Sequence, residues 1–128
     1  MKNFILSALA AIGLFTGCNA QSQVKVLVPE AFITAVEGDT TAVILDVRRP
    51  SEYAEGHLAK AINIDWLNQE AFSKALPTLD KRRTYYVYCR SGRRSNAAAT
   101  KMQDEGFKVF DMAGGYLRWT AEQRPVVK

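Results

Sequence analysis

Segments typical of buried β-strands alternate along this chain with segments typical of helices. The expected strands are 23–28, 42–46, 59–64, 84–89 and 108–112. The expected helices are 29–36, a short helix within 49–57, 67–79, 95–105 and 115–123. Such alternation favours parallel strands joined by helical crossovers, with helices on both faces of the sheet. The sequence therefore predicts a three-layer α/β fold with a five-stranded, mainly parallel sheet.

The size and composition of the chain fit one globular domain. It has 128 residues, of which 48% are apolar and 23% are charged, enough to bury a core but too few for two ordinary domains. Lysine and arginine number 17 against 13 acidic residues, which gives a net charge of +4. That excess suits small anionic ligands and does not require a nucleic acid, so none is expected as a partner. The basic run Lys81, Arg82 and Arg83 is equally well explained as a solvated surface.

The first seventeen residues have the pattern of a secretory signal peptide. Lys2 gives a short positive start, and the apolar stretch 4–15 follows it. That stretch is shorter than the roughly 20 residues that span a bilayer, so a retained transmembrane helix is not expected. We therefore expect residues 1–17 to be a signal peptide, 18–22 a short linker and 23–128 the mature domain.

The signal peptide ends in a sequence that resembles a bacterial lipobox. Phe15-Thr16-Gly17-Cys18 places glycine before cysteine, although Phe15 stands where that motif usually has leucine. Cleavage at a lipobox leaves a lipidated cysteine at the new N-terminus, here Cys18. The alternative is ordinary cleavage after Ala20. In both cases the mature chain is exported; with lipidation it is periplasmic and bound to a bacterial membrane through the lipid anchor alone.

Cys89 stands where ligands bind in open α/β sheets. Once Cys18 is consumed by lipid or removed, Cys89 is the only cysteine left, so no internal disulfide can form. A single cysteine is most often a buried, unreactive apolar residue. Cys89, however, closes the expected strand 84–89, and Asp46 closes the strand 42–46. The carboxyl ends of such strands form the edge at which these folds bind their ligands.

The residues after Cys89 are small or basic, which suits a loop that binds an anion. Gly92 permits backbone angles that are closed to other residues, and Ser91 and Ser95 add little bulk. We expect the loop to curl with its N–H groups pointing inward, while the helix that starts near Ser95 adds the positive end of its dipole. These groups, with the nearby arginines, stabilise the thiolate form of a cysteine. Cys89 is therefore our candidate nucleophile.

Three blocks of the sequence together resemble a single-domain rhodanese, a sulfurtransferase of α/β fold. They are "LDVRRPSEYAEGHLAKAINI" (Leu45–Ile64), "YCRSGRRS" (Tyr88–Ser95) and "AGGYLRW" (Ala113–Trp119). The blocks fall in the order and spacing of that family, and the resemblance covers essentially everything after the signal peptide. Any one of them alone is a weak signal, whereas the three together are specific.

The resemblance implies a thiosulfate sulfurtransferase activity that runs through a persulfide on Cys89. The sulfur donor is a small anion such as thiosulfate, or a persulfide, and the acceptor is a thiol or cyanide. No metal and no organic cofactor is implied, and a monomer is expected. The substrate-binding residues implied are those of the loop, namely Arg90, Ser91, Gly92, Arg93 and Arg94.

The arginines of this loop are expected to have different roles. Arg90 and Arg93 attract the anionic donor. Arg94 holds the shape of the loop by reaching an acid such as Glu52. Among the supporting residues, Asp46 either orients the loop or the Arg48 side chain, or is a purely structural carboxylate. Ser95 supports the loop at the start of the following helix.

Other residues of the three blocks are expected to be structural. His57 is interpreted as a hydrogen-bonding structural residue rather than a general base. Gly114 and Gly115 form a close-approach turn near the pocket, and Trp119 belongs to the core, on the same helical face as Tyr116. Trp66 and Leu67, outside the motif loops, are expected to line the pocket entrance.

Two alternatives remain beside sulfur transfer. Phosphatases and arsenate reductases use a related loop, but the phosphatase loop spans seven residues from cysteine to arginine, whereas Cys89 to Arg94 spans six. A tetrahedral phosphoryl group needs the wider loop. The other alternative is a non-catalytic sulfur carrier or binding module of the same fold. Such modules commonly lack the cysteine, which this chain retains.

Overall fold

Five strands, all parallel, form one sheet in the spatial order β3-β7-β6-β4-β5. The computed structural model describes residues 23–128, and the expected signal peptide 1–17 and linker 18–22, with Cys18, lie outside the described residues. The strands are β3 (Lys25–Leu27), β4 (Ala42–Asp46), β5 (Ile62–Asn63), β6 (Thr84–Tyr88) and β7 (Lys108–Met112). The predicted sheet is confirmed, and its pairings are parallel throughout residues 23–128.

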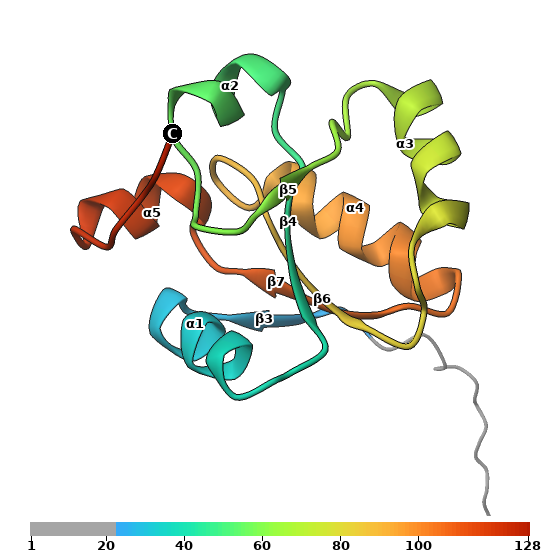
Figure 1. The fold of residues 1–128 in the computed structure, drawn as a ribbon, viewed down its shortest axis with the longest axis horizontal. Coiled ribbons are helices and arrows are strands. Elements are labelled where there is room, and N and C mark those ends of the chain that lie inside the picture. Colours follow the sequence, from blue (N-terminus) through green and yellow to red (C-terminus); the bar gives the residue numbers. More distant parts are fainter. Residues whose placement is uncertain (1–22) are drawn as a thin grey trace, which may run out of the picture.

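Helices cover both faces of this sheet. They are α1 (Pro29–Glu37), α2 (Pro50–Glu55), α3 (Gln69–Ala75), α4 (Arg93–Asp104) and α5 (Gly115–Ala121), with a 3-10 turn η1 (Leu76–Thr78) after α3. Helices α3 and α4 lie on one side of the sheet, and α1 and α5 lie on the other (Figure 1). The predicted three-layer arrangement is therefore correct.

The central strand β6 shows why the sheet has two cores. All five of its residues are buried, as expected for a strand covered on both faces. Tyr85 and Val87 join the cluster that contains Phe72 of α3 and three residues of α4, Ala98, Ala99 and Met102. Tyr86 and Tyr88 point to the opposite face, into the cluster that contains Phe32 of α1 and Trp119 of α5.

Most element boundaries differ from the sequence-based expectations by one or two residues, and three elements differ in an instructive way. The expected strand 59–64 shrinks to the two residues of β5, because Lys60 adopts a left-handed φ of 69° that interrupts extended backbone. The expected helix 67–79 becomes α3 and η1, with Pro77 in the 3-10 turn. Helix α4 begins at Arg93 rather than near Ser95.

Because the strands are parallel, they all begin along one edge of the sheet, its amino edge, and all end along the opposite one, its carboxyl edge. The carboxyl ends of β4, β6 and β7 meet at one edge, which brings together Asp46, Cys89 and the turn 113–115. Gln23, just before β3, lies at the opposite edge, where it lines a hollow with Lys25 and Lys108. None of the helices within residues 23–128 is both long enough and apolar enough to cross a membrane.

Candidate active site

The loop after β6 folds back on the thiol of Cys89. Cys89 is fully buried and unpaired, and the backbone N–H of Gly92 donates a hydrogen bond to its Sγ, with N and S 3.0 Å apart. Gly92 has a left-handed φ of 109°, and α4 starts at the next residue. The expected glycine-dependent curl is therefore present, and one loop amide points at the sulfur.

A turn between β7 and α5 holds the base of this loop. The N–H of Tyr116 donates to the carbonyl of Cys89 (2.8 Å), and the N–H of Leu117 donates to the carbonyl of Arg90 (3.0 Å). Gly115 has a φ of 60°, and a Cβ there would lie 2.5 Å from the carbonyl carbon and oxygen of Arg90. Only glycine fits this approach, which confirms the predicted close turn of Gly114 and Gly115.

Arg94 ties the loop to α2 through Glu52. The guanidinium donates to both carboxylate oxygens of Glu52, at 2.8 and 3.1 Å, and both side chains are largely buried. The hydrogen bond from Arg94 lowers the pKa of Glu52 to about 2, although burial acts in the opposite direction. The predicted contact is present, and the charge of Arg94 is engaged in holding the loop.

A buried ion pair between Asp46 and Arg48 stands beside the loop. The Arg48 Nη2 lies 2.7 Å from Asp46 Oδ2 and also donates to the carbonyl of Gly56 (2.6 Å). The hydroxyl of Tyr88 donates to the same Asp46 oxygen at 2.7 Å, and burial raises the pKa of Tyr88 far above its usual range. Of the roles left open for Asp46, the contacts are those of a carboxylate that orients Arg48.

Arg48 reaches the loop indirectly. Its guanidinium lies 4.1 Å from the ring centre of Tyr116, in the geometry of a cation–π contact. Tyr116 is the residue whose N–H binds the carbonyl of Cys89. A chain of direct contacts thus runs from Asp46 to the backbone of the cysteine.

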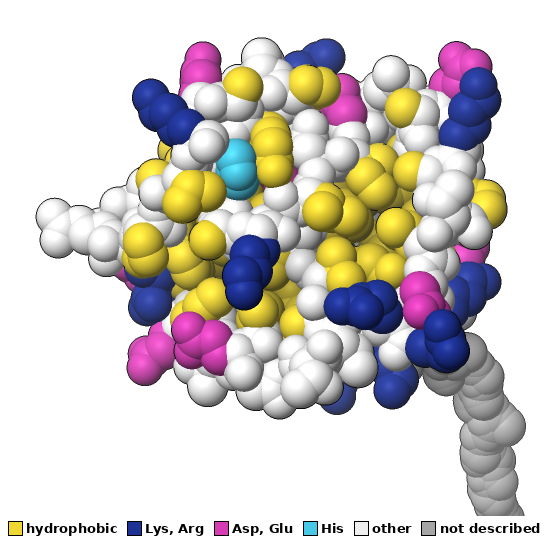
Figure 2. All heavy atoms as spheres, in the orientation of Figure 1, with side chains coloured by type: hydrophobic (Ala, Val, Ile, Leu, Met, Phe, Trp, Pro, Cys, Tyr) yellow, Lys and Arg dark blue, Asp and Glu magenta, His cyan; other side chains and the backbone are white. Residues whose placement is uncertain are grey.

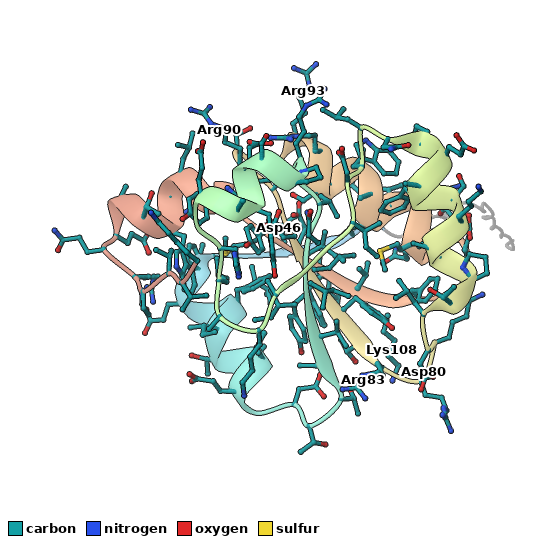
Figure 3. The ribbon with its side chains drawn as sticks, turned by 45° about the horizontal axis from the view of Figure 1, so that its top comes forward. Asp46, Asp80, Arg83, Arg90, Arg93 and Lys108 are labelled. Carbon is teal, nitrogen blue, oxygen red and sulfur yellow. The ribbon has the colours of Figure 1, made fainter. Side chains whose placement is uncertain are left out.

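The remaining loop side chains face solvent. Arg90, Ser91 and Arg93 are exposed, and within residues 23–128 the guanidinium groups of Arg90 and Arg93 form no ion pair. Figure 3 shows both arginines projecting from the same end of the molecule. Two unpaired cations are therefore available to an anion that approaches the loop. Ser95, in contrast, is buried, and its Oγ donates to the carbonyl of Gly92 at 3.2 Å.

The residues expected to be structural are mostly in place. His57 stacks on Tyr53 with ring centres 3.7 Å apart, and its Nδ1 lies 2.9 Å from the Tyr53 carbonyl, which fits the predicted structural role. Trp119 is buried, and its Nε1 donates to the carbonyl of Pro125. Trp66, expected with Leu67 to line the pocket entrance, instead packs against Phe72 and the core cluster, and Leu67 is exposed.

One buried carboxyl near the loop was missed from the sequence. Asp111 of β7 is 2% exposed, and its Oδ2 accepts a hydrogen bond from Asn96 Nδ2 (3.3 Å) in the first turn of α4. Burial raises the pKa of Asp111, against hydrogen bonds that lower it. The signal that would have found it is the alternation along β7, which places Asp111 on the same face as the buried Val109.

The whole domain is similar to known proteins. The family model described as the rhodanese-like domain matches residues 29–122. The Bacillus subtilis protein YtwF is 31% identical over 103 residues, which cover 80% of this chain and 97% of YtwF. Thiosulfate sulfurtransferase GlpE of Coxiella burnetii is 34% identical over 80 residues, 62% of this chain and 72% of GlpE. This chain spans about half the length of other curated relatives.

The fold agrees with a solved structure of the same size. The crystal structure of a rhodanese-related protein from Thermoplasma volcanium superposes with a TM-score of 0.72 at 28% sequence identity. The similarity covers 80% of this chain and 97% of that one. The similarity therefore extends over nearly all of that structure.

Proposed function

This chain belongs to the rhodanese-like domain family, and we propose that it is a sulfurtransferase in which Cys89 carries a sulfane sulfur as a persulfide. The observation that carries the proposal is the contact between the Gly92 N–H and the buried sulfur of Cys89. A donor aimed at this sulfur stabilises negative charge on it, and it stands in place before the reaction begins.

The reaction has two displacement steps on sulfur. The Cys89 thiolate attacks the outer sulfur of thiosulfate, the S–S bond of the donor breaks, and sulfite leaves with the bonding electrons. A thiophile then attacks the outer sulfur of the persulfide, and the Cys89 thiolate is released. Cyanide gives thiocyanate and a thiol gives a new persulfide, so electrons balance without an external oxidant or reductant.

The arginines divide between substrate and scaffold in this proposal. Arg90 and Arg93, exposed and without an ion pair in the described domain, attract the anionic donor through their charge. Arg94 is paired with Glu52, so it holds the loop rather than an oxyanion. That pairing, together with a loop of six residues, favours sulfur transfer over phosphoryl transfer.

We further propose that the chain is exported and held at a bacterial membrane by lipid on Cys18. The support is the signal-like sequence 1–17 and the lipobox-like Phe15–Cys18. Labelling cells with an alkyne palmitate analogue tests this, with Cys18→Ala as the control. A mature protein that begins at Gln21 and carries no label would show that ordinary cleavage after Ala20 is correct.

The catalytic proposal is tested by the assay of thiocyanate formed from thiosulfate and cyanide. The wild-type domain is expected to turn over, and Cys89→Ser is expected to form no thiocyanate. Mass spectrometry of the reduced protein after exposure to thiosulfate should show the gain of one sulfur atom, on Cys89 only. Full turnover by Cys89→Ser would exclude the assigned nucleophile. A wild-type protein that gains no sulfur from any donor would indicate a binding module.

A further inference from the structure

Exposed basic side chains gather at the amino end of the sheet, opposite Cys89. Lys25 begins β3, Lys108 begins β7, and Arg83 directly precedes β6. The sheet register places Thr84 beside Lys108 and Lys25 beside Phe110, so all three cations lie at one edge. Figure 3 shows Arg83 and Lys108 at the end of the molecule away from Arg90 and Arg93.

These cations are not compensated by ion pairs. Within residues 23–128, the side chains of Lys25, Arg83 and Lys108 form no salt bridge. Seven of the thirteen other basic side chains in this range do, namely Arg48, Lys74, Arg82, Arg94, Lys101, Arg118 and Arg124. Lys81 adds a further exposed charge, since its Nζ donates only to the carbonyl of Glu105. Figure 2 shows Lys and Arg side chains gathered over the amino ends of β6 and β7.

The acidic residues at this edge are mostly engaged. Asp39 accepts hydrogen bonds from Thr41 and from the hydroxyl of Tyr86, Asp80 pairs with Arg82, and Asp104 is exposed. Glu37 and Glu105 also lie here, and Glu105 pairs with Lys101. The positive character of the edge therefore rests on the cations that form no ion pair within the described domain, Lys25, Lys81, Arg83 and Lys108.

The same edge contains a hollow of about 690 Å³. Lys25 and Lys108 line it together with Tyr86 and Phe110, whose rings stack 5.3 Å apart. Asp39, Asp104 and Gln103 also line it. Lysine and aromatic side chains that line one hollow suit a ligand that is anionic at one end and apolar at the other, which is the chemistry of a phospholipid at a membrane surface.

We propose that this basic edge, defined by Lys25, Lys81, Arg83 and Lys108, docks on the anionic phospholipids of a membrane surface. Because the strands are parallel, Cys89 lies at the other edge of the sheet and faces away from the lipid. The position of Gln23 agrees with this orientation, because Gln23, the first described residue, lines the hollow at the basic edge. A tether from the proposed anchor to Gln23 has five residues and reaches at most about 17 Å. The surface is built from the domain itself and does not require the anchor.

The test is binding of the domain 23–128 to vesicles, with phosphatidylglycerol in phosphatidylcholine compared with phosphatidylcholine alone. We expect the domain to fold alone, because the relative YtwF consists almost entirely of the matched region. Circular dichroism checks that each variant is folded. Each basic residue near an anionic surface contributes about fivefold to partitioning. Lys25→Gln/Arg83→Gln/Lys108→Gln is therefore expected to lower cosedimentation with anionic vesicles about 100-fold, and high salt to abolish it.

The matched control removes three charges from the other end, as Arg49→Gln/Arg90→Gln/Arg93→Gln. It leaves the basic edge intact and is expected to keep vesicle binding within about fivefold of wild type. Equal losses in both triple variants would overturn the proposal, because net charge alone would then explain binding. Equal binding to both vesicle types would overturn it, as would tighter binding of a DNA oligonucleotide or an acidic peptide than of anionic vesicles. The basic-edge variant should keep thiocyanate formation unchanged, so this surface and the proposed catalysis fail independently.

Discussion

The molecule contains the same aspartate–arginine unit at each end of the sheet, once buried and once exposed. In both, the arginine lies two residues after the aspartate and its backbone N–H donates to Oδ1, at 2.9 Å for Arg48 on Asp46 and 2.8 Å for Arg82 on Asp80. In both, Nη2 reaches Oδ2, at 2.7 and 3.1 Å. The arginine side chain, however, is 4% exposed in the first unit and 90% exposed in the second.

The difference shows that local geometry alone does not decide how much an ion pair contributes to the stability of the fold. Water already solvates the charges of Arg82 and Asp80, so their pair adds little. Asp46 has no solvent contact, so its charge depends on Arg48 and on the hydroxyl of Tyr88. The Asp46–Arg48 pair at the carboxyl edge is thus part of the buried structure, whereas the Asp80–Arg82 pair at the amino edge stays largely in water.

The largest expected effect comes from Arg48→Met compared with Arg82→Met. Arg48→Met leaves the Asp46 carboxylate buried without its cation, and we expect a loss of about 3–5 kcal/mol in the free energy of unfolding. Arg82→Met removes a solvated pair and should leave that free energy unchanged. Urea unfolding followed by tryptophan fluorescence measures both. Similar losses in the two variants would contradict the distinction drawn from burial.

A second comparison uses alanine in place of glycine at each end. Gly115→Ala places a Cβ against the backbone of Arg90 at a φ of 60°, and we expect a loss of about 2–4 kcal/mol together with a displaced cysteine loop and lost turnover. Gly38→Ala, near the amino edge, meets only an ordinary contact of 3.6 Å to the Thr34 carbonyl. It should change stability by no more than about 0.5 kcal/mol.

The third comparison concerns turnover and rests on the proposed function. Arg90→Gln/Arg93→Gln removes the unpaired cations beside the loop and is expected to raise the KM for thiosulfate about tenfold with little change in kcat. Arg83→Gln/Lys108→Gln removes the same charge at the other edge and should leave both constants unchanged. Steady-state kinetics at low ionic strength measures KM and kcat for both variants. A KM that rises equally in both variants would mean that net charge alone attracts the donor.

Sequence reasoning was most successful where one local signal decides the structure. The bounds of β4 and β7 are as predicted, because each is a run of five residues dominated by apolar side chains. The link between Glu52 and Arg94 was also predicted, through the family resemblance of the blocks that contain them. These features depend on residue type and order, which the sequence states directly.

The features that sequence reasoning missed depend on tertiary burial. Asp46 was expected to orient the loop or the Arg48 side chain, but the complete burial of this pair was not predicted, and Asp80–Arg82 has the same spacing and is exposed. Asp111 was overlooked because its carboxyl group is buried by helix α4, which packs over β7 only in the folded chain. The short β5 is a different case, because it follows from the local left-handed backbone of Lys60, which its residue type does not predict.

A smaller effect is expected at the link between the loop and α2. Glu52→Gln removes the ion pair with Arg94 and should lower the free energy of unfolding by about 1 kcal/mol at neutral pH. Since the pKa of Glu52 is lowered from 4.5 to about 2, this stability is present above pH 4.5 and is lost as the pH falls toward 2. The difference between wild type and variant should shrink over that window. Glu70→Gln, in the exposed pair with Lys74, should show no such pH dependence.

The smallest effect is a gain in stability. Asp111→Asn keeps the shape of the side chain and an oxygen for Asn96 but removes a buried charge. The pKa of Asp111 is raised by burial, so its contribution to stability is complete below the ordinary carboxyl pKa of 3.8 and falls as the pH rises through the higher folded value. We therefore expect the variant to be more stable than wild type by about 0.5–1 kcal/mol at neutral pH.

The pH dependence distinguishes the removal of the buried Asp111 charge from a simple change in side-chain packing. Below the ordinary pKa both proteins carry a neutral group at this position, so urea unfolding in acid should give equal stabilities. A gain that persists in acid would mean that shape, not charge, limits the site. The exposed Asp104, near the other end of α4, provides the control, because Asp104→Asn removes a charge that water already solvates. Only the buried carboxyl at the loop end of α4 should therefore respond.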